Sequence, residues 1–226
     1  MAPAPDQPTV VICAKNEEQT VANVVKAALR FASCVLVVDG RSRDRTREEA
    51  ARAGAAVIQD GGKGKGEAIR CAIPHITSAI TVFMDADGSH DPSDIPRLVA
   101  PILAGEADHV SGSRLLGGSS ELHGGFDECF RLMGSSFITA CINWRFKVRL
   151  SESQNGFRAI RTEVLRQLDL RENITTIEQE MIIKTLRKGF RMAEVPAHEH
   201  SRKAGKSSIR LSRVAFRYVW NVVRNM

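Results

Sequence analysis

In the first half of the chain, short apolar runs rich in β-branched residues alternate with longer segments typical of helices. Strands and helices that alternate over short links favour a parallel sheet with right-handed crossovers. The sequence therefore predicts an α/β fold with a mostly parallel central sheet flanked by helices. We expect strands at 9–13, 34–38, 56–58 and in the run that ends at Asp85, and helices at 17–31, 44–53 and from Glu67 onward.

The pattern changes after residue 111. Glycine and serine are frequent at 114–125, which indicates a loop, and 126–145 has the pattern of a long helix. Further strands are expected at 155–160 and 191–195. The chain has 226 residues, of which 43% are hydrophobic, so it can bury a full core and we expect one globular domain.

The net charge of +6 is concentrated at the C-terminal end. Residues 201–226 contain seven Lys and Arg and no acid, and the remainder has 25 basic against 26 acidic residues. A nucleic-acid-binding body would carry a basic face of its own. The charge pattern therefore argues against nucleic acid as a partner.

Cysteine usage and hydropathy bear on the compartment. The five cysteines are odd in number and lack C-x-x-C spacing, so they indicate neither a disulfide framework nor a zinc site. We find no signal-peptide pattern and no run of about eighteen apolar residues that would span a membrane. We expect a cytoplasmic protein.

Two carboxylates one residue apart directly follow an apolar run, in the stretch 82–88. In an open α/β sheet the carboxyl end of a strand is where ligands bind. Asp85 and Asp87 would point the same way on an extended segment, which lets them share one hydrated Mg²⁺ or Mn²⁺. Substrate phosphates normally complete such a site, which suggests a nucleoside diphosphate. A solvated turn over residues 88–93 is the alternative interpretation.

Several motifs occur in an order that resembles the inverting family-2 glycosyltransferases with the GT-A fold. Later stretches narrow the resemblance to the dolichol-phosphate mannose synthase branch, which moves a hexose from a nucleotide sugar to a polyprenyl phosphate. The similarity covers roughly residues 8–208 and depends on the joint order of the motifs. These motifs are Ala14-Lys15-Asn16-Glu17-Glu18 and the segments 38–46, 63–68, 85–87, 111–114, 131–135, 155–158 and 202–207.

The resemblance implies a set of donor-binding residues. Glu17 and Asp39 would hold the base and ribose, because a carboxylate accepts from the ring N–H of uracil or guanine and from ribose hydroxyls. Lys65 lies where the family has a basic residue near the nucleotide. Arg158 and Arg202 would face the donor diphosphate or the sugar.

The resemblance also implies Mg²⁺ or Mn²⁺ as a cofactor. Asp87 would ligate the ion that bridges both phosphates, Asp85 would contact ribose or metal-bound water, and Ala86 lies between them at the donor. Ser89 stands where many mannose synthases have a Gln ligand, so it would bind the metal directly or through water. Gly40 replaces the second Asp of the family's Val-Asp-Asp run, which weakens any transfer of donor preference.

On the acceptor side, Arg114, Arg131 and Ser135 match positions that grip the acceptor phosphate in this family. Arginine suits this role because its fork of permanently charged donors fits a phosphate dianion. Solvated arginines on a helix surface are the alternative. Glu178 and Glu180 lie where many relatives place a catalytic acid, and on a helix at most one of them would point inward.

We therefore expect an inverting, metal-dependent hexosyltransferase. The ion held by Asp87 and the guanidinium of Arg202 would stabilise the departing nucleoside diphosphate. The favoured reaction moves mannose from GDP-mannose to a polyprenyl phosphate, which is ionised near pH 7 and needs no base. The alternative uses a UDP-sugar, with glucose or N-acetylglucosamine, and a polyprenyl phosphate or a soluble hydroxyl acceptor. A hydroxyl acceptor would require Glu180 or Glu178 as a base.

The C-terminal end has its own pattern. As a helix, residues 209–226 would place four arginines within about 60° of one another, beside a wide apolar and aromatic face. Such a helix fits an anionic lipid surface, or it closes the core or a homodimer. We expect a glycosyltransferase domain at 1–208 and this amphipathic helix at 209–226, with the protein peripheral on the inner face of the membrane. The four arginines of this helix are Arg210, Arg213, Arg217 and Arg224.

Overall fold

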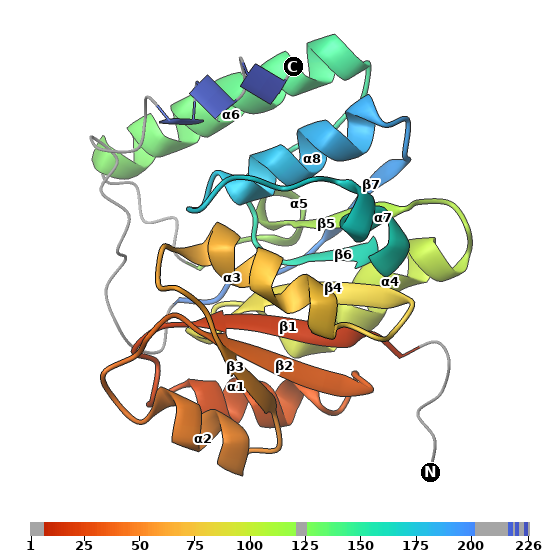
Figure 1. Cartoon of the computed structure of the whole chain (residues 1–226). Coiled ribbons are helices and arrows are strands. Elements are labelled where there is room, and N and C mark those ends of the chain that lie inside the picture. The colour runs from red at the N-terminus through yellow and green to blue at the C-terminus, as the bar shows by residue number, and fades with distance from the viewer. Residues whose placement is uncertain (1–6, 121–125, 202–216, 219, 222–223, 226) are drawn as a thin grey trace.

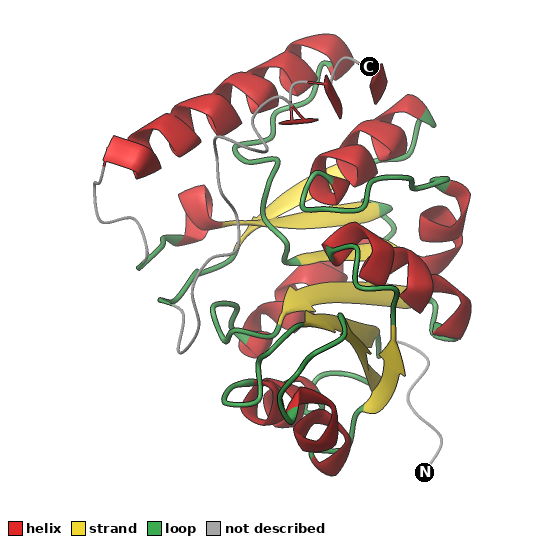
Figure 2. Cartoon of the chain, turned by 60° about the vertical axis from the view of Figure 1, so that its left-hand side comes forward, coloured by secondary structure: helices red, strands yellow, loops and turns green. Residues whose placement is uncertain are grey.

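A seven-stranded sheet in the order β3-β2-β1-β4-β6-β5-β7 forms the centre of the molecule, with helices on both faces (Figures 1 and 2). The structure is a computed structural model that describes residues 7–120, 126–201, 217–218, 220–221 and 224–225. Its strands are β1 (Thr9–Ala14), β2 (Cys34–Asp39), β3 (Ala56–Gln59), β4 (Ile80–Asp85), β5 (His109–Ser113), β6 (Arg158–Arg161) and β7 (Met192–Pro196). Only β6 runs antiparallel to its neighbours, β4 and β5, within the part described. The predicted α/β class is confirmed.

Two helix layers cover the sheet. The helices are α1 (Val21–Ala28), α2 (Thr46–Arg52), α3 (Lys65–Ala72), α4 (Ile95–Leu103), α5 (Arg114–Gly117), α6 (Phe126–Phe146), α7 (Thr162–Gln167) and α8 (Ile177–Arg187), with 3₁₀ turns η1 (Ile73–His75) and η2 (Pro92–Asp94). In β1, Val10 and Ile12 pack on the layer of α1, α2 and α4, whereas Val11 packs on the layer of α3, α7 and α8. Both faces of the strand are buried, which explains why the strands read as continuous apolar runs.

A third layer is formed by α6, which lies on the outer side of α8 (Figure 1). Ile138 and Ile142 of α6 pack against Ile182 and Ile183 of α8 in a small separate core. Tyr218, from the C-terminal end of the chain, packs against the same core. The α6–α8 layer therefore also supports the described residues of the C-terminal end.

The predicted C-terminal helix lies mostly outside the described residues. The six described positions after residue 216 are helical. Asn221 and Asn225 are buried, and the carbonyl oxygen of Asn225 accepts a hydrogen bond of 2.9 Å from Arg187 of α8. Among these six described residues, Asn221 and Asn225 therefore face the body of the protein.

Some element boundaries differ from the sequence prediction. The segment 17–20 forms a hydrogen-bonded turn, so that α1 begins only at Val21. Strand β6 begins at Arg158 because the side chain of Asn155 accepts the Phe157 amide and makes a turn. Helix α4 was not predicted. It contains an interior proline, Pro101, and such a residue normally ends a helix.

The glycines of the loop before α3 allow another loop to approach closely. Gly64 has a φ of +128°, and a Cβ there would lie 2.6 Å from the carbonyl oxygen of Asn173. A Cβ on Gly66 would overlap the carbonyl oxygen of Glu172. The Gly66 amide donates to Asn173 at 2.9 Å. The segment that precedes α8 is therefore seated on the start of α3.

We predict that Gly66→Ala lowers the free energy of unfolding by about 1–3 kcal/mol, because the methyl group forces two backbone segments apart. Gly134→Ala in α6 is the matched control. A Cβ there has no neighbouring atom within 4 Å, so this change should raise stability by about 0.4–1 kcal/mol. Urea denaturation of both variants measures the difference. Similar effects in the two variants would contradict the close approach at Gly66.

Candidate active site

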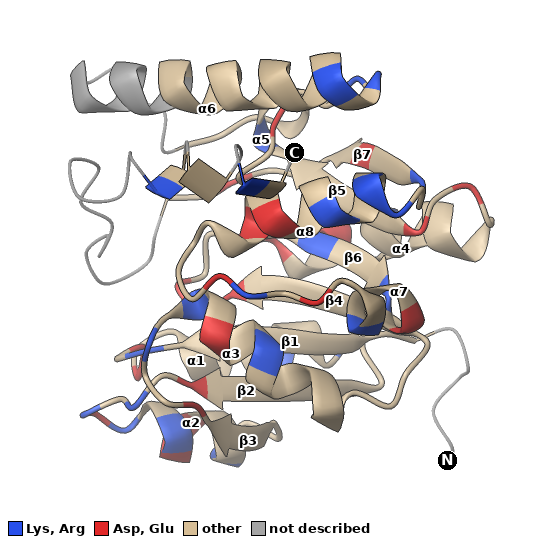
Figure 3. Cartoon of the chain, turned by 45° about the horizontal axis from the view of Figure 1, so that its top comes forward, with Lys and Arg blue, Asp and Glu red and all other residues tan. Residues whose placement is uncertain are grey.

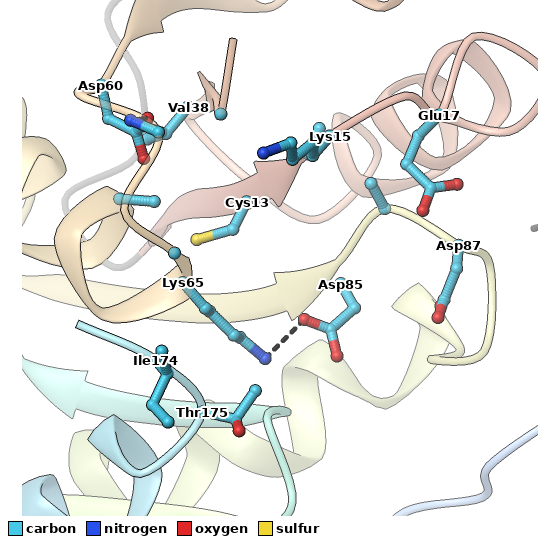
Figure 4. A pocket seen from close by; sticks show the side chains of 16 residues that line it. Cys13, Lys15, Glu17, Val38, Asp60, Lys65, Asp85, Asp87, Ile174 and Thr175 are labelled. Atoms are coloured by element: carbon cyan, nitrogen blue, oxygen red, sulfur yellow. Dashed lines mark hydrogen bonds and ion pairs between the residues drawn. The ribbon is translucent and has the colours of Figure 1, made fainter. Parts of the chain in front are cut away.

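A cavity of about 340 Å³ opens at the carboxyl ends of β1, β2, β3 and β4 (Figure 4). The chain crosses from β1 to β2 on one side, while β4 lies on the other, so the cavity sits where the strand order reverses. Open α/β sheets bind their ligands at such points. The strand ends contribute Cys13, Val38, Asp60 and Asp85, and a loop before α8 contributes Ile174 and Thr175.

The acidic stretch after β4 lines this cavity with all three of its residues, Asp85, Ala86 and Asp87. Asp87 is 4% exposed, and its Oδ1 accepts from the amide of Ser89 at 3.0 Å and from the Ser89 hydroxyl at 2.7 Å. Ser89 therefore orients Asp87. The amide of Asp85 donates to Nδ1 of His90 at 3.1 Å, so the turn folds back on itself. The stretch is a tight turn and also a wall of the cavity.

Lys65, at the start of α3, lies between two carboxylates. Its Nζ is 2.5 Å from Oδ1 of Asp85 and 2.9 Å from Oε1 of Glu178. Burial opposes the charge of Lys65, but the two carboxylates outweigh it and raise the pKa well above its usual range. Lys65 is therefore a cation at physiological pH. A Cβ on Gly156 would lie 2.5 Å from this Nζ, so glycine leaves room for the ion pair.

Arg158, predicted to face the donor, is fully buried in β6 and is not among the lining residues. Its guanidinium donates to the carbonyl oxygen of Glu178 at 3.0 Å and to that of Asn155. Burial lowers the pKa of Arg158 to about 10, which leaves it charged at neutral pH. Arg158 thus supports Glu178 from behind the cavity.

The two glutamates of α8 point to different surroundings. Glu178 pairs with Lys65, whereas Glu180 accepts from the amides of Arg171 and Glu172 at 3.0 and 2.8 Å. Glu180 also pairs with Lys184 at 2.7 Å. Of the two, Glu178 is near the cavity and Glu180 anchors the preceding loop. The role of Glu180 as a base remains a prediction.

At the other end of the cavity, Glu17 lines the wall and accepts from the hydroxyl of Thr20 at 3.2 Å. Asp39 is fully buried, and its carboxylate accepts from the Ser42 amide at 3.2 Å and the Gln59 side chain at 3.1 Å. It is not a lining residue, and Gly40 next to it is. Asp39 therefore shapes this end of the cavity from behind.

Three lining residues with ionisable side chains, Cys13, Lys15 and Asp60, had no assigned role in the sequence prediction. Lys15 was part of a motif, but Cys13 and Asp60 carried no recognisable signal. Burial is the main cause of the raised pKa of Cys13, about 12, so the thiol is neutral and not a nucleophile. Burial also raises the pKa of Asp60, which follows β3. Asp60 reaches the site because β3 pairs in parallel with β2, a contact that the local sequence does not indicate.

The residues predicted for the acceptor phosphate are only partly described. The guanidinium of Arg114 is 2.6 Å from Glu152 and 2.9 Å from Glu199, and these carboxylates outweigh burial to raise the pKa of Arg114. Ser135 is half-buried on α6. The side chain of Arg131, and all of Arg202, lie outside the described residues. The structure therefore brings Asp85, Asp87, Glu17 and Lys65 together and leaves the acceptor side as a prediction.

A model of glycosyl transferase family 2 matches residues 9–169 of this chain. The chain belongs to glycosyl transferase family 2. The glycosyltransferase AglJ of Haloferax volcanii is 30% identical over 209 residues, covering 91% of this chain and 67% of AglJ. The dolichyl-phosphate hexose transferase of the same organism is 29% identical over 210 residues, covering 90% of this chain and 87% of that protein. The predicted family and the enzyme class, a glycosyltransferase, are confirmed.

The fold of this family 2 glycosyltransferase has solved counterparts. The glucosyl-3-phosphoglycerate synthase of Mycobacterium tuberculosis, in complex with Mn²⁺, uridine diphosphate and glucosyl-3-phosphoglycerate, matches it with a TM-score of 0.78 at 21% identity. The match covers 97% of this chain and 80% of the synthase. The predicted GT-A fold is confirmed.

We predict that Lys65→Met lowers the free energy of unfolding by about 3 kcal/mol, because Asp85 and Glu178 lose the cation between them. This is the low end for a broken buried pair, since the Asp85 side chain is 31% exposed. Lys63→Met is the control in the same loop, where the side chain is 69% exposed and pairs with Glu67 at 3.7 Å. It should change stability by less than about 1 kcal/mol. Urea denaturation at pH 7 compares them, and equal losses would argue against a special role for Lys65.

Proposed function

We propose that this family 2 glycosyltransferase transfers a hexose, with inversion, from a nucleoside diphosphate sugar to a polyprenyl phosphate. The observation that carries the proposal is the pair Asp85 and Asp87, which line one cavity where the strand order reverses. The similarity to a dolichyl-phosphate hexose transferase supports the acceptor half.

The lining residues fit a divalent cation that needs few protein ligands. Asp85 and Asp87 supply carboxylate oxygens, the donors that Mg²⁺ and Mn²⁺ prefer, and substrate phosphates and water complete such sites. Among the described residues there is no cluster of three or more His, Cys, Asp or Glu that could hold a metal alone. Bound there, the ion would offset the charge that develops on the leaving diphosphate. Ser89 would act through Asp87, which it orients.

The chain's own residues bind and orient the donor in this proposal. Glu17 would accept from ribose hydroxyls, and Gly40, which lines the same cavity, would lie near the base. Lys65 keeps Asp85 in a fixed position and balances its charge. Arg202 is proposed to face the leaving diphosphate and thereby to stabilise it.

A phosphate acceptor agrees with how the glutamates of α8 are engaged. A hydroxyl acceptor would need a carboxylate base, but Glu178 is paired with Lys65 and Glu180 with Lys184 and two amides. A phosphate monoester is already ionised and needs positioning and charge neutralisation only. We propose that Arg114, together with Arg131 and Ser135, provides this positioning. GDP-mannose is the first donor to test, and UDP-glucose and UDP-N-acetylglucosamine are the alternatives.

The outer face of α6 offers a membrane contact for such an acceptor. Met133, Phe137 and Trp144 are 61%, 67% and 74% exposed, and their spacing places them on one side of the helix. Exposed basic residues gather at its C-terminal end, where Lys147 lies 5.5 Å from the ring centre of Trp144 (Figure 3). Aromatic and basic side chains together suit an anionic lipid surface.

We therefore propose peripheral association through α6, helped by the residues at 209–226. No helix within the described ranges is long and apolar enough to cross a bilayer. A homodimer through the same face is the competing arrangement. The two differ in whether anionic lipid is needed for the contact.

We predict that Asp87→Asn lowers kcat for hexose transfer at least about a hundredfold, the scale for losing a group that stabilises transition-state charge. The amide keeps an oxygen for Ser89, so the fold should be unaffected. The assay follows transfer from each of the three donors to a short isoprenyl phosphate with Mn²⁺. Asp91→Asn, in the same turn, should retain activity.

Two outcomes would overturn the proposal. Wild-type turnover in the Asp87 variant would remove the metal assignment. Transfer to hydroxyl acceptors only, with no product from any isoprenyl phosphate, would overturn the acceptor half and leave the donor half in place.

We also predict that the double substitution Phe137→Ser and Trp144→Ser reduces binding to vesicles that contain anionic lipid by about a hundredfold, roughly tenfold per large side chain withdrawn from the interface. Flotation measures the bound fraction. Leu103→Ser, on α4, removes an apolar side chain of 53% exposure from another surface and should not change binding. Loss of self-association in place of vesicle binding would identify the face as a dimer contact.

A further inference from the structure

The wall of the cavity nearest Lys65 and Asp85 is formed by Ile174 and Thr175 (Figure 4). These residues belong to the segment 171–176, which connects α7 to α8 and has no regular structure of its own before its last turn. Such a connection takes its position from side chains that hold it. Its anchors therefore decide the shape of this side of the cavity.

Two anchors come from the neighbouring helices. From α3, Arg70 donates to the carbonyl oxygen of Glu172 and to the side chain of Asn173, next to the close approach at Gly66. From α8, Glu180 accepts from the amides of Arg171 and Glu172. Both anchors hold the first half of the segment. Ile174 and Thr175, which line the cavity, come after it.

The second half is held by local hydrogen bonds at Ile174 and Thr176, and by one contact from the C-terminal end of the chain. The hydroxyl of Tyr218 lies 2.7 Å from the hydroxyl of Thr175, a contact across 43 residues of sequence. The ring of Tyr218 packs on the core between α6 and α8, so the hydroxyl is presented by a fixed side chain. Asn225, two turns further on, is tied to Arg187 of α8 at 2.9 Å. The described residues of the C-terminal end are therefore held near both ends of α8, and one of them, Tyr218, contacts the cavity wall.

We propose that Tyr218 is a positioning residue for the donor. Its hydrogen bond to Thr175 holds Ile174 and Thr175 at the spacing from Lys65 and Asp85 that the nucleoside diphosphate sugar requires. The proposal rests on the proposed function, because it takes the cavity to be the donor site. It extends that function by making the C-terminal end a part of donor binding.

The other face of the same end is exposed. Trp220 is 53% exposed, and Arg217 and Arg224 are also at the surface. A ligand that bound this aromatic and basic face more tightly while Tyr218 contacts Thr175 would strengthen donor binding, and the donor would strengthen its binding by the same factor.

The test measures nucleotide binding, which needs no acceptor. Calorimetry with GDP and with UDP, each with Mg²⁺, should show that Tyr218→Phe weakens binding of the preferred nucleotide roughly three- to tenfold, the scale of one hydrogen bond. Thr175→Val should do the same. If both act through one contact, the double variant is no weaker than either single variant. In the transfer assay the donor KM should rise while kcat changes less.

Trp220→Phe, which keeps an aromatic ring on the exposed face, is the matched control and should bind as the wild type does. Because Tyr218 is the one tyrosine of the chain, 3-fluorotyrosine gives a single ¹⁹F resonance. This resonance should shift on adding nucleotide to the wild type and not to Thr175→Val, and the melting temperatures of both should be alike.

Wild-type affinity in Tyr218→Phe, or additive losses in the double variant, would overturn the role of Tyr218 and leave the proposed function intact. A wild-type protein that binds neither nucleotide would overturn the donor site itself, and the role of Tyr218 with it.

Discussion

The site depends on the ammonium group of Lys65, which joins three elements of the fold. Through Asp85 and Glu178 it connects the end of β4 to the starts of α3 and α8. The positive charge of Lys65 offsets the repulsion between these two carboxylates. Gly156 leaves room for this group, and Arg158 donates to the carbonyl oxygen of Glu178 behind it.

The two aspartates are held by different groups. Asp85 pairs with Lys65, and the amide and hydroxyl of Ser89 orient Asp87. His90 closes the turn, and its ring stacks on Phe157 at 5.0 Å between centres. Phe157 belongs to the main core. The acidic turn is thus held by the interior of the protein, as the proposed metal site would require.

Local sequence patterns were enough to predict much of the fold, but a smaller part of the site. Strands β1 to β4 were predictable because β-branched apolar runs and short polar links are features of neighbouring residues. A strand was also expected at 155–160, but the antiparallel place of β6 between β4 and β5 was not, since it depends on pairing with segments far away in sequence. At the site, Asp85 and Asp87 follow directly from a strand end. The partners of Arg114 do not, because Glu152 and Glu199 lie 38 and 85 residues further along the chain.

Charge balance in the cavity supports a divalent cation independently of any motif. The charged side chains that line it are two bases and four acids, although burial raises the pKa of one of the acids. A nucleoside diphosphate would bring at least two more negative charges into this partly buried site. Such an arrangement is strongly unfavourable without compensation, and a divalent ion between carboxylates and phosphates supplies it. Lys65 cannot compensate the charge of the diphosphate, because it is already paired with Asp85 and Glu178. In the proposed donor complex, Lys65 would offset the carboxylates of the protein, and a bound divalent cation would offset the charge of the diphosphate.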